Sequence, residues 1–394
     1  MRTPAQIATV TAMNLRNLPS RASTAAVAMV GIAGVVAVML GVLSIREGFR
    51  KTLETTGSPD VALVLRAGSN SEMSSIIFKD SVGVIEQAPG VASDANGKLV
   101  SPEPYVVVDV PKRTTNTPAN VPLRGVNADA VRVHKNVHIV EGRMFTPGLN
   151  ELIVGRGAAG QFAGLEMGSS VKWGRTTWNV VGIFAADGGL PESEIWADLR
   201  TVQDAYNRTS VQTVRVNLES PEAFQAFKDA LTSDPRLEVS VEREPDFYAA
   251  QSKYISFFAQ VFGGILAFLM GLGAVFGAIL TMYSAVAART REIATLRALG
   301  FGALPIVVSV LTEALLLGLI GGIVGGLIAL LWFNGMQTTT LNWQSFSQVT
   351  FAFAITPALL VTGITYALLL GLVGGMLPSV RAARLPITQG LREM

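Results

Sequence analysis

The chain has 394 residues, of which 49% are hydrophobic and 15% charged, and its formal net charge is +2. This composition is typical of a protein that lies partly in a membrane. The small net charge does not indicate nucleic-acid binding. The absence of cysteine excludes disulfides, iron–sulfur clusters, thiolate zinc sites and cysteine nucleophiles. The two histidines, His134 and His138, lie in a stretch expected to be extended or irregular, so their spacing does not indicate a metal site.

The start of the chain predicts a membrane helix. Residues 1–21 are expected to form a cytoplasmic amphipathic helix, and residues 22–50 the first transmembrane helix. No charged residue lies between Arg21 and Arg46, and ~20 apolar residues of helix cross a bilayer core. Because this run is longer than the ~7–15-residue apolar core of a signal peptide, we expect it to be retained.

Residues 51–253 are polar enough to fold in water and are expected to form an α+β extracytoplasmic domain. Strand–helix–strand patterns near both of its ends predict a ferredoxin-like part, residues 55–126 and 209–245, with a β-rich part, residues 127–208, inserted in it. The expected strands are residues 61–65, 91–100, 105–110, 151–154, 170–173, 177–184, 194–197, 213–218 and 237–241, and the expected helices are residues 80–87 and 222–231.

A glycine-rich segment of the inserted part, G-R-G-A-A-G at residues 155–160, matches the dinucleotide-binding fingerprint G-x-G-x-x-G after a strand. That fingerprint also requires an acidic residue ~20 positions later, at the tip of a second parallel strand. Residues 173–180 contain no acidic residue. We therefore expect a turn into a short helix here rather than a nucleotide site.

The rest of the chain predicts three more membrane helices, which gives an α-helical membrane domain of four transmembrane helices with the α+β domain between the first and the second. The second apolar run exceeds a bilayer crossing, so its helix is expected to continue as a stalk. The expected segments are residues 254–288 (second helix and stalk), 289–302 (cytoplasmic loop), 303–333 (third helix), 334–350 (uncharged extracytoplasmic loop), 351–378 (fourth helix, ended by Pro378) and 379–394 (cytoplasmic tail).

Arginines flank these spans mainly on one side, which predicts the orientation. With both termini in the cytoplasm, all three clusters lie inside, and the protein is a multi-pass protein of the cell (inner) membrane. Arg46, Arg50 and Lys51 oppose this orientation, but they precede a long domain, and long translocated segments largely escape the rule. The clusters are Arg2, Arg16 and Arg21; Arg289, Arg291 and Arg297; and Arg381, Arg384 and Arg392.

Glycines with G-x-x-x-G spacing recur in the last three spans, and such small faces let helices approach closely in lipid. Two alternatives stay open, because spacing alone does not separate packing within one subunit from a dimer interface. The pairs are Gly273/Gly277, Gly318/Gly322, Gly321/Gly325, Gly322/Gly326 and Gly371/Gly375.

Glu313 is the one acidic residue of the third span. It lies roughly 15 Å along the helix if the helix starts near residue 303. An acid at membrane depth is a functional candidate by default. We favour a structural pairing with an arginine at the interface over a role in proton coupling.

Residues 289–301, R-T-R-E-I-A-T-L-R-A-L-G-F, resemble the loop after the second span of FtsX-like and MacB-type (LolC/E-related) ABC transporter permeases. The likeness continues in E-A-L-L-L-G-L-I-G-G at residues 313–322 and in P-S-V-R-A-A-R-L-P-I at residues 378–387. The last stretch has one residue fewer before its proline, and Gln389-Gly390 replaces the usual small pair. Weaker likenesses, in residues 14–18, 123–126, 141–145 and 155–183, extend the resemblance over nearly the whole chain.

The resemblance implies a permease subunit driven by mechanotransmission, in which a separate dimeric ATPase pushes on the cytoplasmic loop and the stalks move the outer domain. A short helix there would carry Ile293, Leu296 and Leu299 on one side. The alternative is that the arginines only set topology and bind anionic headgroups. The candidate coupling residues are Arg289, Arg291, Glu292, Ile293, Leu296, Arg297 and Leu299.

The chain contains no G-x-x-x-x-G-K-[ST] segment, no H-E-x-x-H and no Ser/His/Asp set. We therefore expect no enzyme activity, no catalytic, cofactor or metal residues, and ATP hydrolysis by a partner subunit.

Three functions remain open: export or extraction of a lipoprotein, lipid, peptide or drug; an FtsX-like signalling role toward a partner such as a cell-wall hydrolase; and a membrane-anchored binding protein. The large inserted part favours the first, and the cytoplasmic loop argues against the third. Expected partners are the ATPase, a second permease copy or paralogue, an extracytoplasmic adaptor or substrate protein, and lipid, with no nucleic acid.

Overall fold

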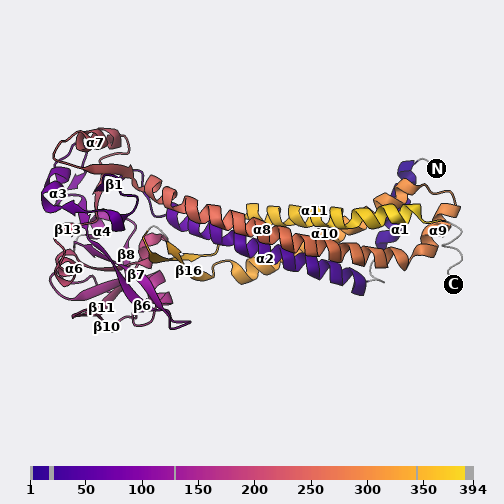
Figure 1. Cartoon of the computed structure of the whole chain (residues 1–394), viewed down its shortest axis with the longest axis horizontal. Coiled ribbons are helices and arrows are strands. Elements are labelled where there is room, and N and C mark those ends of the chain that lie inside the picture. The colour runs from indigo at the N-terminus through magenta and orange to yellow at the C-terminus, as the bar shows by residue number, and fades with distance from the viewer. Residues whose placement is uncertain (1–2, 17–21, 128–129, 343–344, 387–394) are drawn as a thin grey trace. The chain divides into compact units, whose positions relative to one another are not determined.

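The computed structural model describes residues 3–16, 22–127, 130–342 and 345–386 (Figure 1). The chain forms two compact units. The membrane unit comprises Met1–Glu47, Phe257–Met336 and Phe353–Met394, and the α/β unit comprises Gly48–Ser256 and Gln337–Ala352. Three arginines of the predicted basic clusters, Arg2, Arg21 and Arg392, lie outside the described residues, as does the end of the predicted tail.

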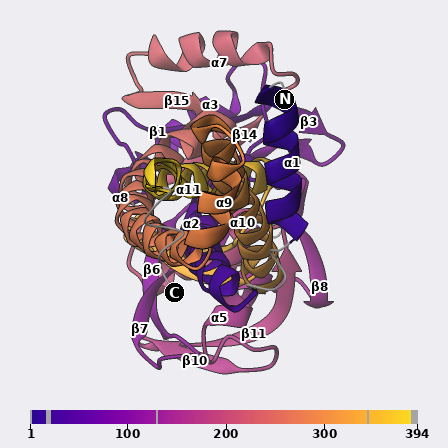
Figure 2. The ribbon, with the colours of Figure 1, turned by 90° about the vertical axis from the view of Figure 1, so that its right-hand side faces the viewer.

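Four helices in the described part of the chain are long and apolar enough to cross a membrane. Helices are expected of such segments, because a spanning segment must satisfy its backbone hydrogen bonds internally in lipid. This confirms the predicted fold class. The four are α2 (Ala22–Glu54), α8 (Glu244–Ala287), α10 (Ala303–Phe333) and α11 (Pro357–Arg384), and the shorter helices of the same unit are α1 (Thr3–Arg16) and α9 (Thr290–Ala298) (Figure 2).

Helix α8 begins earlier than predicted. It starts at Glu244, directly after a strand of the α/β unit, and its 44 residues span about 66 Å at the helical rise. The hydrocarbon core of a bilayer is only about 30 Å thick. The stalk is therefore longer than the sequence indicated, because the polar residues 244–253 continue the helix rather than preceding it.

The predicted fourth span is shifted. Residues 351 and 352 end a strand, and α11 begins at Pro357, where the Thr356 side chain accepts a hydrogen bond from the backbone of Leu359. Pro378 does not end this helix, although proline within a helix removes one hydrogen bond and costs about 3 kcal/mol. The last turn persists with Ala382 buried against the neighbouring helices and with Ala383 also buried.

Small residues bring α10 and α11 close together. A Cβ atom on Gly318 would lie 2.8 Å from the carbonyl oxygen of Ala367, and one on Gly371 would lie 2.6 Å from that of Ala314. A Cβ on Gly322 would lie 2.7 Å from the Cβ of Ala367, one on Gly375 would lie 2.6 Å from the Cβ of Ala314, and one on Gly326 would lie 3.3 Å from Leu360. These glycines pack within the subunit. By contrast, nothing described lies within 4 Å of a Cβ placed on Gly273 or Gly277 of α8.

The first sheet of the α/β unit has the order β15-β1-β14-β5, with antiparallel neighbours. Its strands are β1 (Val61–Arg66), β5 (Val100–Glu103), β14 (Thr213–Asn217) and β15 (Val239–Arg243), and its helices are α3 (Lys79–Glu86) and α7 (Ala223–Thr232). Val64, Val214, Ile85 and Phe227 meet in its core. The predicted strand at 91–100 is instead mostly a small hairpin, β3 (Ser93–Asp94) and β4 (Gly97–Lys98), because Gly97 has a φ of 117°.

The second sheet has seven strands in the order β10-β11-β9-β12-β7-β6, with β8 also paired to β11. The strands are β6 (Tyr105–Pro111), β7 (Pro118–Val126), β8 (His138–Gly142), β9 (Glu151–Gly155), β10 (Ser170–Trp173), β11 (Thr176–Ala185) and β12 (Ile195–Asp198). The second part thus begins near residue 105, not at the predicted residue 127. Strand β7 escaped prediction because Pro118, Pro122 and Gly125 interrupt its β-branched pattern.

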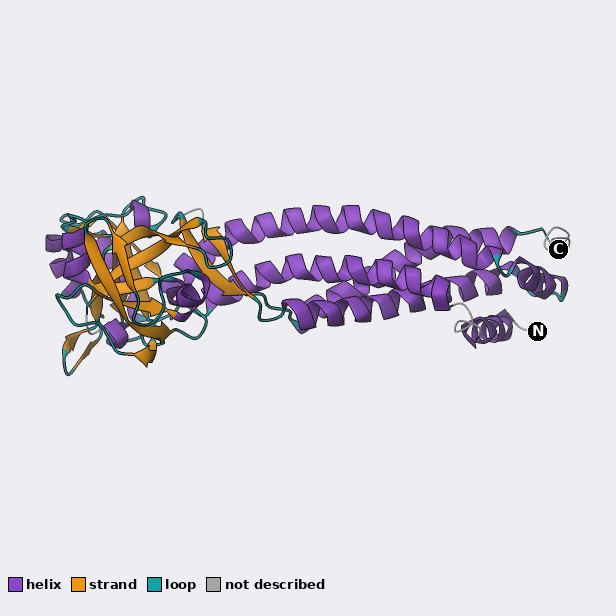
Figure 3. Cartoon of the chain, turned by 90° about the horizontal axis from the view of Figure 1, so that it is seen from below, coloured by secondary structure: helices purple, strands orange, loops and turns teal. Residues whose placement is uncertain are grey.

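Smaller elements complete the α/β unit, whose strands are orange in Figure 3. They are α4 (Ala130–Val133), α5 (Arg156–Gln161), α6 (Leu199–Ala205), the 3₁₀ turns η2 (Glu72–Ser74) and η3 (Leu190–Ser193), and the paired short strands β2 (Ile77–Phe78) and β13 (Ser210–Val211). The predicted loop between the third and fourth spans contains a hairpin, β16 (Gln337–Asn342) and β17 (Ser347–Ala352), and this hairpin belongs to the α/β unit.

Candidate functional site

Helix α9 forms the centre of the predicted coupling loop. Gly300, with a φ of 91°, ends it. The amide of Gly300 donates to the carbonyl of Arg297, and the amide of Phe301 donates to that of Leu296. This is the Schellman arrangement that stops a helix with a glycine in the left-handed conformation. The glycine of the L-G-F segment at residues 299–301 is thus explained by the end of helix α9.

The apolar stripe of α9 is divided between the inside and the outside of the chain. Ile293 is buried against Val286, Ile306 and Val310, so it belongs to the chain's own core. Ile293 was predicted as a candidate coupling residue, but its burial leaves no exposed side chain for a partner to bind. Leu296 is half-buried, whereas Leu299 is 72% exposed.

Arg297 joins α9 to the end of α11. Its guanidinium donates to the carbonyl oxygens of Ala383 at 2.9 Å and Leu385 at 2.8 Å. The last carbonyls of a helix have no partner within the helix, and a basic side chain there also suits the helix dipole. Arg297 therefore has an intramolecular role, and Arg291 is the exposed arginine of α9.

Arg289, immediately before α9, forms a buried ion pair with Glu313 of α10, at 2.6 Å. The amide nitrogen of Asn14, in α1, donates to the same carboxylate at 2.8 Å, and Arg289 donates to the amide oxygen of Asn14. The exposed fractions of Asn14, Arg289 and Glu313 are 4%, 6% and 2%. The structure thus gives Glu313 an arginine partner and adds Asn14, which the sequence did not identify as a site residue.

A second buried polar cluster lies in the α/β unit and centres on Arg124 of β7. Its guanidinium contacts Glu72 at 2.7 and 3.0 Å, Glu103 at 2.8 Å and Glu194 at 2.7 Å twice. All four side chains are less than 10% exposed. Since Glu103 is on β5 of the first sheet and Arg124 is on β7 of the second, with Glu194 just before β12, the cluster fastens the two sheets to each other.

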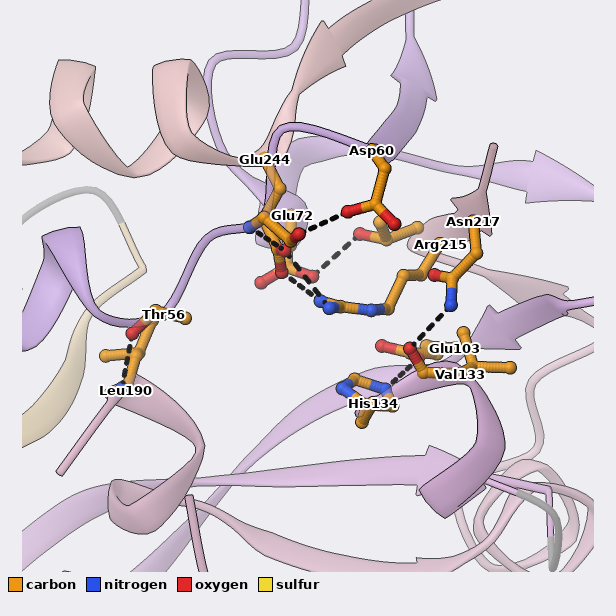
Figure 4. A network of polar contacts seen from close by, with 12 residues as sticks. Thr56, Asp60, Glu72, Glu103, Val133, His134, Leu190, Arg215, Asn217 and Glu244 are labelled. Carbon is orange, nitrogen blue, oxygen red and sulfur yellow. Dashed lines mark hydrogen bonds and ion pairs between the residues drawn. The ribbon is translucent and has the colours of Figure 1, made fainter. Parts of the chain in front are cut away.

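His134 extends this cluster, with its Nε2 atom 2.7 Å from Glu103 (Figure 4). Burial by itself would raise the pKa of Glu103, but its interactions with His134 and the Arg124 guanidinium outweigh burial and lower that pKa to about 2. Glu103 is therefore ionised at neutral pH. No sequence pattern predicted this cluster, because its members lie far apart in the chain.

The ends of α2 and α8 that lie in the α/β unit are hydrogen-bonded to a strand and to a turn of that unit. Glu244, the first residue of α8, is fully buried and pairs with Arg215 of β14 through two contacts, one of them 3.0 Å long. The same carboxylate accepts from the amide of Ser58, just after α2, at 3.1 Å. The Thr56 hydroxyl accepts from the amide of Leu190 at 2.6 Å.

The β16–β17 hairpin is bound to the second sheet and its turns by hydrogen bonds. The amide of Thr350 donates to the Ser193 hydroxyl at 2.8 Å, and this hydroxyl donates to the Thr350 carbonyl at 3.3 Å. Tyr105 and Ser347 share a hydrogen bond of 3.1 Å, and Asn120 donates to the carbonyl of Phe346 at 2.9 Å. The hairpin, which lies between α10 and α11 in the sequence, is thus held inside the α/β unit.

The glycine-rich segment at 155–160 has a packing role. A Cβ atom on Gly155 would clash with the backbone of Glu192 in η3, and one on Gly157 would lie 3.2 Å from Thr350 of the hairpin. The segment is the start of the short helix α5, as the sequence predicted.

Comparison with known proteins gives two family matches. Residues 25–234 match the MacB-like periplasmic core domain, and residues 264–387 match the FtsX-like permease C-terminal region. No curated protein matches the chain.

Among solved structures, the chain is similar to two domains of transport proteins. It is 17% identical to the extracellular domain of the noncanonic ABC-type transporter YknZ from Gram-positive bacteria, covering 46% of this chain and 100% of that one, with a TM-score of 0.35. It is 11% identical to the periplasmic region of MacB from Actinobacillus actinomycetemcomitans, covering 52% of this chain and 97% of that one, with a TM-score of 0.37.

Proposed function

The chain belongs to the ABC-type permeases, as an FtsX-like permease with a MacB-like periplasmic core domain, and we propose that it transmits the work of a separate ATPase to that domain. The substrate would be a lipoprotein, lipid, peptide or drug that is exported or extracted at the outer side of the membrane. Both termini and α9 would then lie in the cytoplasm, on the side of the ATPase.

The observation that supports this proposal is that contacts with the rest of the chain hold α9 at both ends and in the middle. The ion pair of Arg289 holds one end of the helix, Arg297 holds it to the end of α11, and Ile293 anchors its middle. Leu299 and Arg291 remain exposed. A helix fixed in this way moves with the spans when it is pushed, whereas a loop that only marks topology needs no such packing.

Motion would reach the α/β unit through three connections. Helices α2 and α8 end among buried hydrogen bonds at Thr56 and Glu244, and the β16–β17 hairpin is bound through Ser193 and Thr350. Because these ends are hydrogen-bonded to β14 and to the turn η3 of the α/β unit, displacement of the spans would be passed to the domain.

A second permease copy or paralogue would complete the transporter. Helix α8 exposes large apolar side chains, among them Phe262, Phe268 and Phe276, and nothing described covers Gly273 or Gly277. This face suits lipid and a second permease, while the glycines of α10 and α11 are already used within the chain. An adaptor or substrate protein would meet the α/β unit from outside.

Binding of the ATPase tests the proposal. We expect Leu299→Asp to weaken association with the co-expressed ATPase at least tenfold, because burial of a leucine contributes roughly 1.5–3 kcal/mol and an unpaired charge opposes burial further. The matched control is Ser233→Asp, which adds the same charge at an exposed position of the α/β unit. Wild-type association of Leu299→Asp, measured by pull-down and titration, would contradict the coupling role of α9.

A further inference from the structure

We infer that Asn14 is a positioning residue for the coupling helix, and that α1 acts as a brace that holds α9 in the orientation the ATPase binds. This inference rests on the coupling role proposed for α9. It concerns a helix whose sequence suggested only an amphipathic segment before the first span.

Asn14 occupies the contact between three separate segments of the chain. Its amide nitrogen donates to Glu313 of α10 at 2.8 Å and lies 3.4 Å from the carbonyl of Ser309, while its amide oxygen accepts from Arg289. Arg289 also donates to Glu313. The three side chains therefore form a closed ring of hydrogen bonds with one positive and one negative charge.

The chemistry of the ring suits asparagine in particular. An amide donates through nitrogen and accepts through oxygen at the same time, so one side chain serves both the guanidinium and the carboxylate. The Nε atom of Arg289 is buried and already has no hydrogen-bond partner. An apolar side chain at position 14 would leave a further donor of Arg289 unsatisfied, and such groups are costly when buried.

Helix α1 also reaches the other end of α9. The side chain of Gln6 lies 3.5 Å from the carbonyl oxygen of Gly300, the residue that caps α9. Between these ends, Val10 and Met13 of α1 and Leu296 of α9 line a cavity of about 20 Å³. Helix α1 therefore has contacts near both ends of α9, at Arg289 before its first turn and at Gly300 after its last.

Loss of the ring would let α9 leave its docking orientation part of the time. When only a fraction of a protein is competent to bind, the apparent Kd rises by the reciprocal of that fraction, and a saturating partner restores the competent state. Asn14→Leu should therefore raise the apparent Kd for the ATPase about tenfold while the maximal turnover of the saturated complex stays within about twofold. The matched control is Ala12→Leu, which adds leucine at an exposed position of the same helix.

Moving the carboxylate from position 313 to position 14 distinguishes a positioning role of Asn14 from a role in packing alone. Asn14→Asp places a second carboxylate beside one arginine, so we expect it to weaken ATPase binding. Adding Glu313→Gln restores one carboxylate, one guanidinium and one amide to the ring, with the carboxylate now at position 14. The double variant should recover binding to within about threefold of wild type, a difference of about 0.7 kcal/mol.

Each outcome bears on one claim. If Asn14→Leu binds the ATPase as wild type does, or if the double variant binds no better than Asn14→Asp, the brace is wrong. If Asn14→Leu lowers the turnover of the saturated complex as much as it weakens binding, the residue only maintains the fold and the inference fails. The proposed function itself fails separately, through wild-type binding by Leu299→Asp.

Discussion

The two units solve the burial of charge in opposite ways. In the membrane unit a single carboxylate, Glu313, is matched by a single guanidinium and one amide. In the α/β unit Arg124 is shared by three carboxylates, and its five N–H groups are all used. In the first arrangement the two charges cancel, so both partners can be removed together without leaving a buried charge. In the second, removing Arg124 together with any one carboxylate still leaves two buried carboxylates. The difference suits a unit in lipid and a unit whose two sheets must be held together.

The largest expected effect is that of Arg124→Met. Removing this guanidinium leaves three buried carboxylates without their cation, and breaking a buried ion pair typically costs about 3–5 kcal/mol. We expect at least this loss in the free energy of unfolding of the α/β unit, measured by urea denaturation with fluorescence of Trp178 and Trp196. The control Arg113→Met breaks a half-exposed pair with Glu166 and should cost less than about 1 kcal/mol. Equal losses in the free energy of unfolding for Arg124→Met and Arg113→Met would show that the buried cluster stabilises the unit no more than the half-exposed pair does.

The membrane pair should behave differently when both partners are removed. Glu313→Leu alone leaves Arg289 buried without its anion, and we expect a loss of about 3 kcal/mol in stability toward unfolding in detergent. Combining it with Arg289→Met should recover most of that loss, because replacing a buried pair by apolar residues is often neutral. A double variant no more stable than Glu313→Leu would show that the pair stabilises the membrane unit beyond its charge balance.

The acid sensitivity of the α/β unit sharpens the comparison further. The pKa of Glu103 falls from an ordinary value of 4.5 to about 2 in the folded unit. Its ionised form therefore adds stability that is complete above pH 4.5 and is lost as the pH falls toward 2, by up to about 3 kcal/mol. Glu103→Gln should reduce the loss of stability between pH 4.5 and 2, although the pKa of Glu151, also about 2, keeps part of it.

For this acid titration the control is Glu166→Gln, at an exposed carboxylate. This variant should keep the full dependence on pH. An unchanged dependence in Glu103→Gln would place the acid-sensitive contact elsewhere.

Local patterns predicted the elements better than the contacts between them. Uncharged runs located the four spans, and the arginine partner expected for Glu313 is Arg289, since few charges lie near membrane depth. Periodicity placed Ile293 and Leu299 on one side of α9, but it carries no information about what covers that side. The shared side is buried at Ile293 and open at Leu299 because α10 and α11 pack over only one end.

The contacts that join distant segments could not be predicted from the sequence. The ring at Asn14 unites residues almost 300 positions apart, and the cluster at Arg124 unites four strands and turns. No spacing rule links such positions. The boundary at residue 105 was missed for a related reason, because β6 has the same alternation in either sheet and only its pairing with β7 assigns it.

The β16–β17 hairpin has a consequence for how the domain is isolated. Its strands come from between α10 and α11, yet Thr350 occupies the space next to Gly157 and Phe351 packs edge-on against Phe49. A soluble fragment cut as one continuous piece, residues 48–256, would lack both strands and would expose Phe49, Tyr105 and Ser193 to water. Joining residues 337–352 to that piece through a linker restores the missing surface and gives a better starting point for ligand screening.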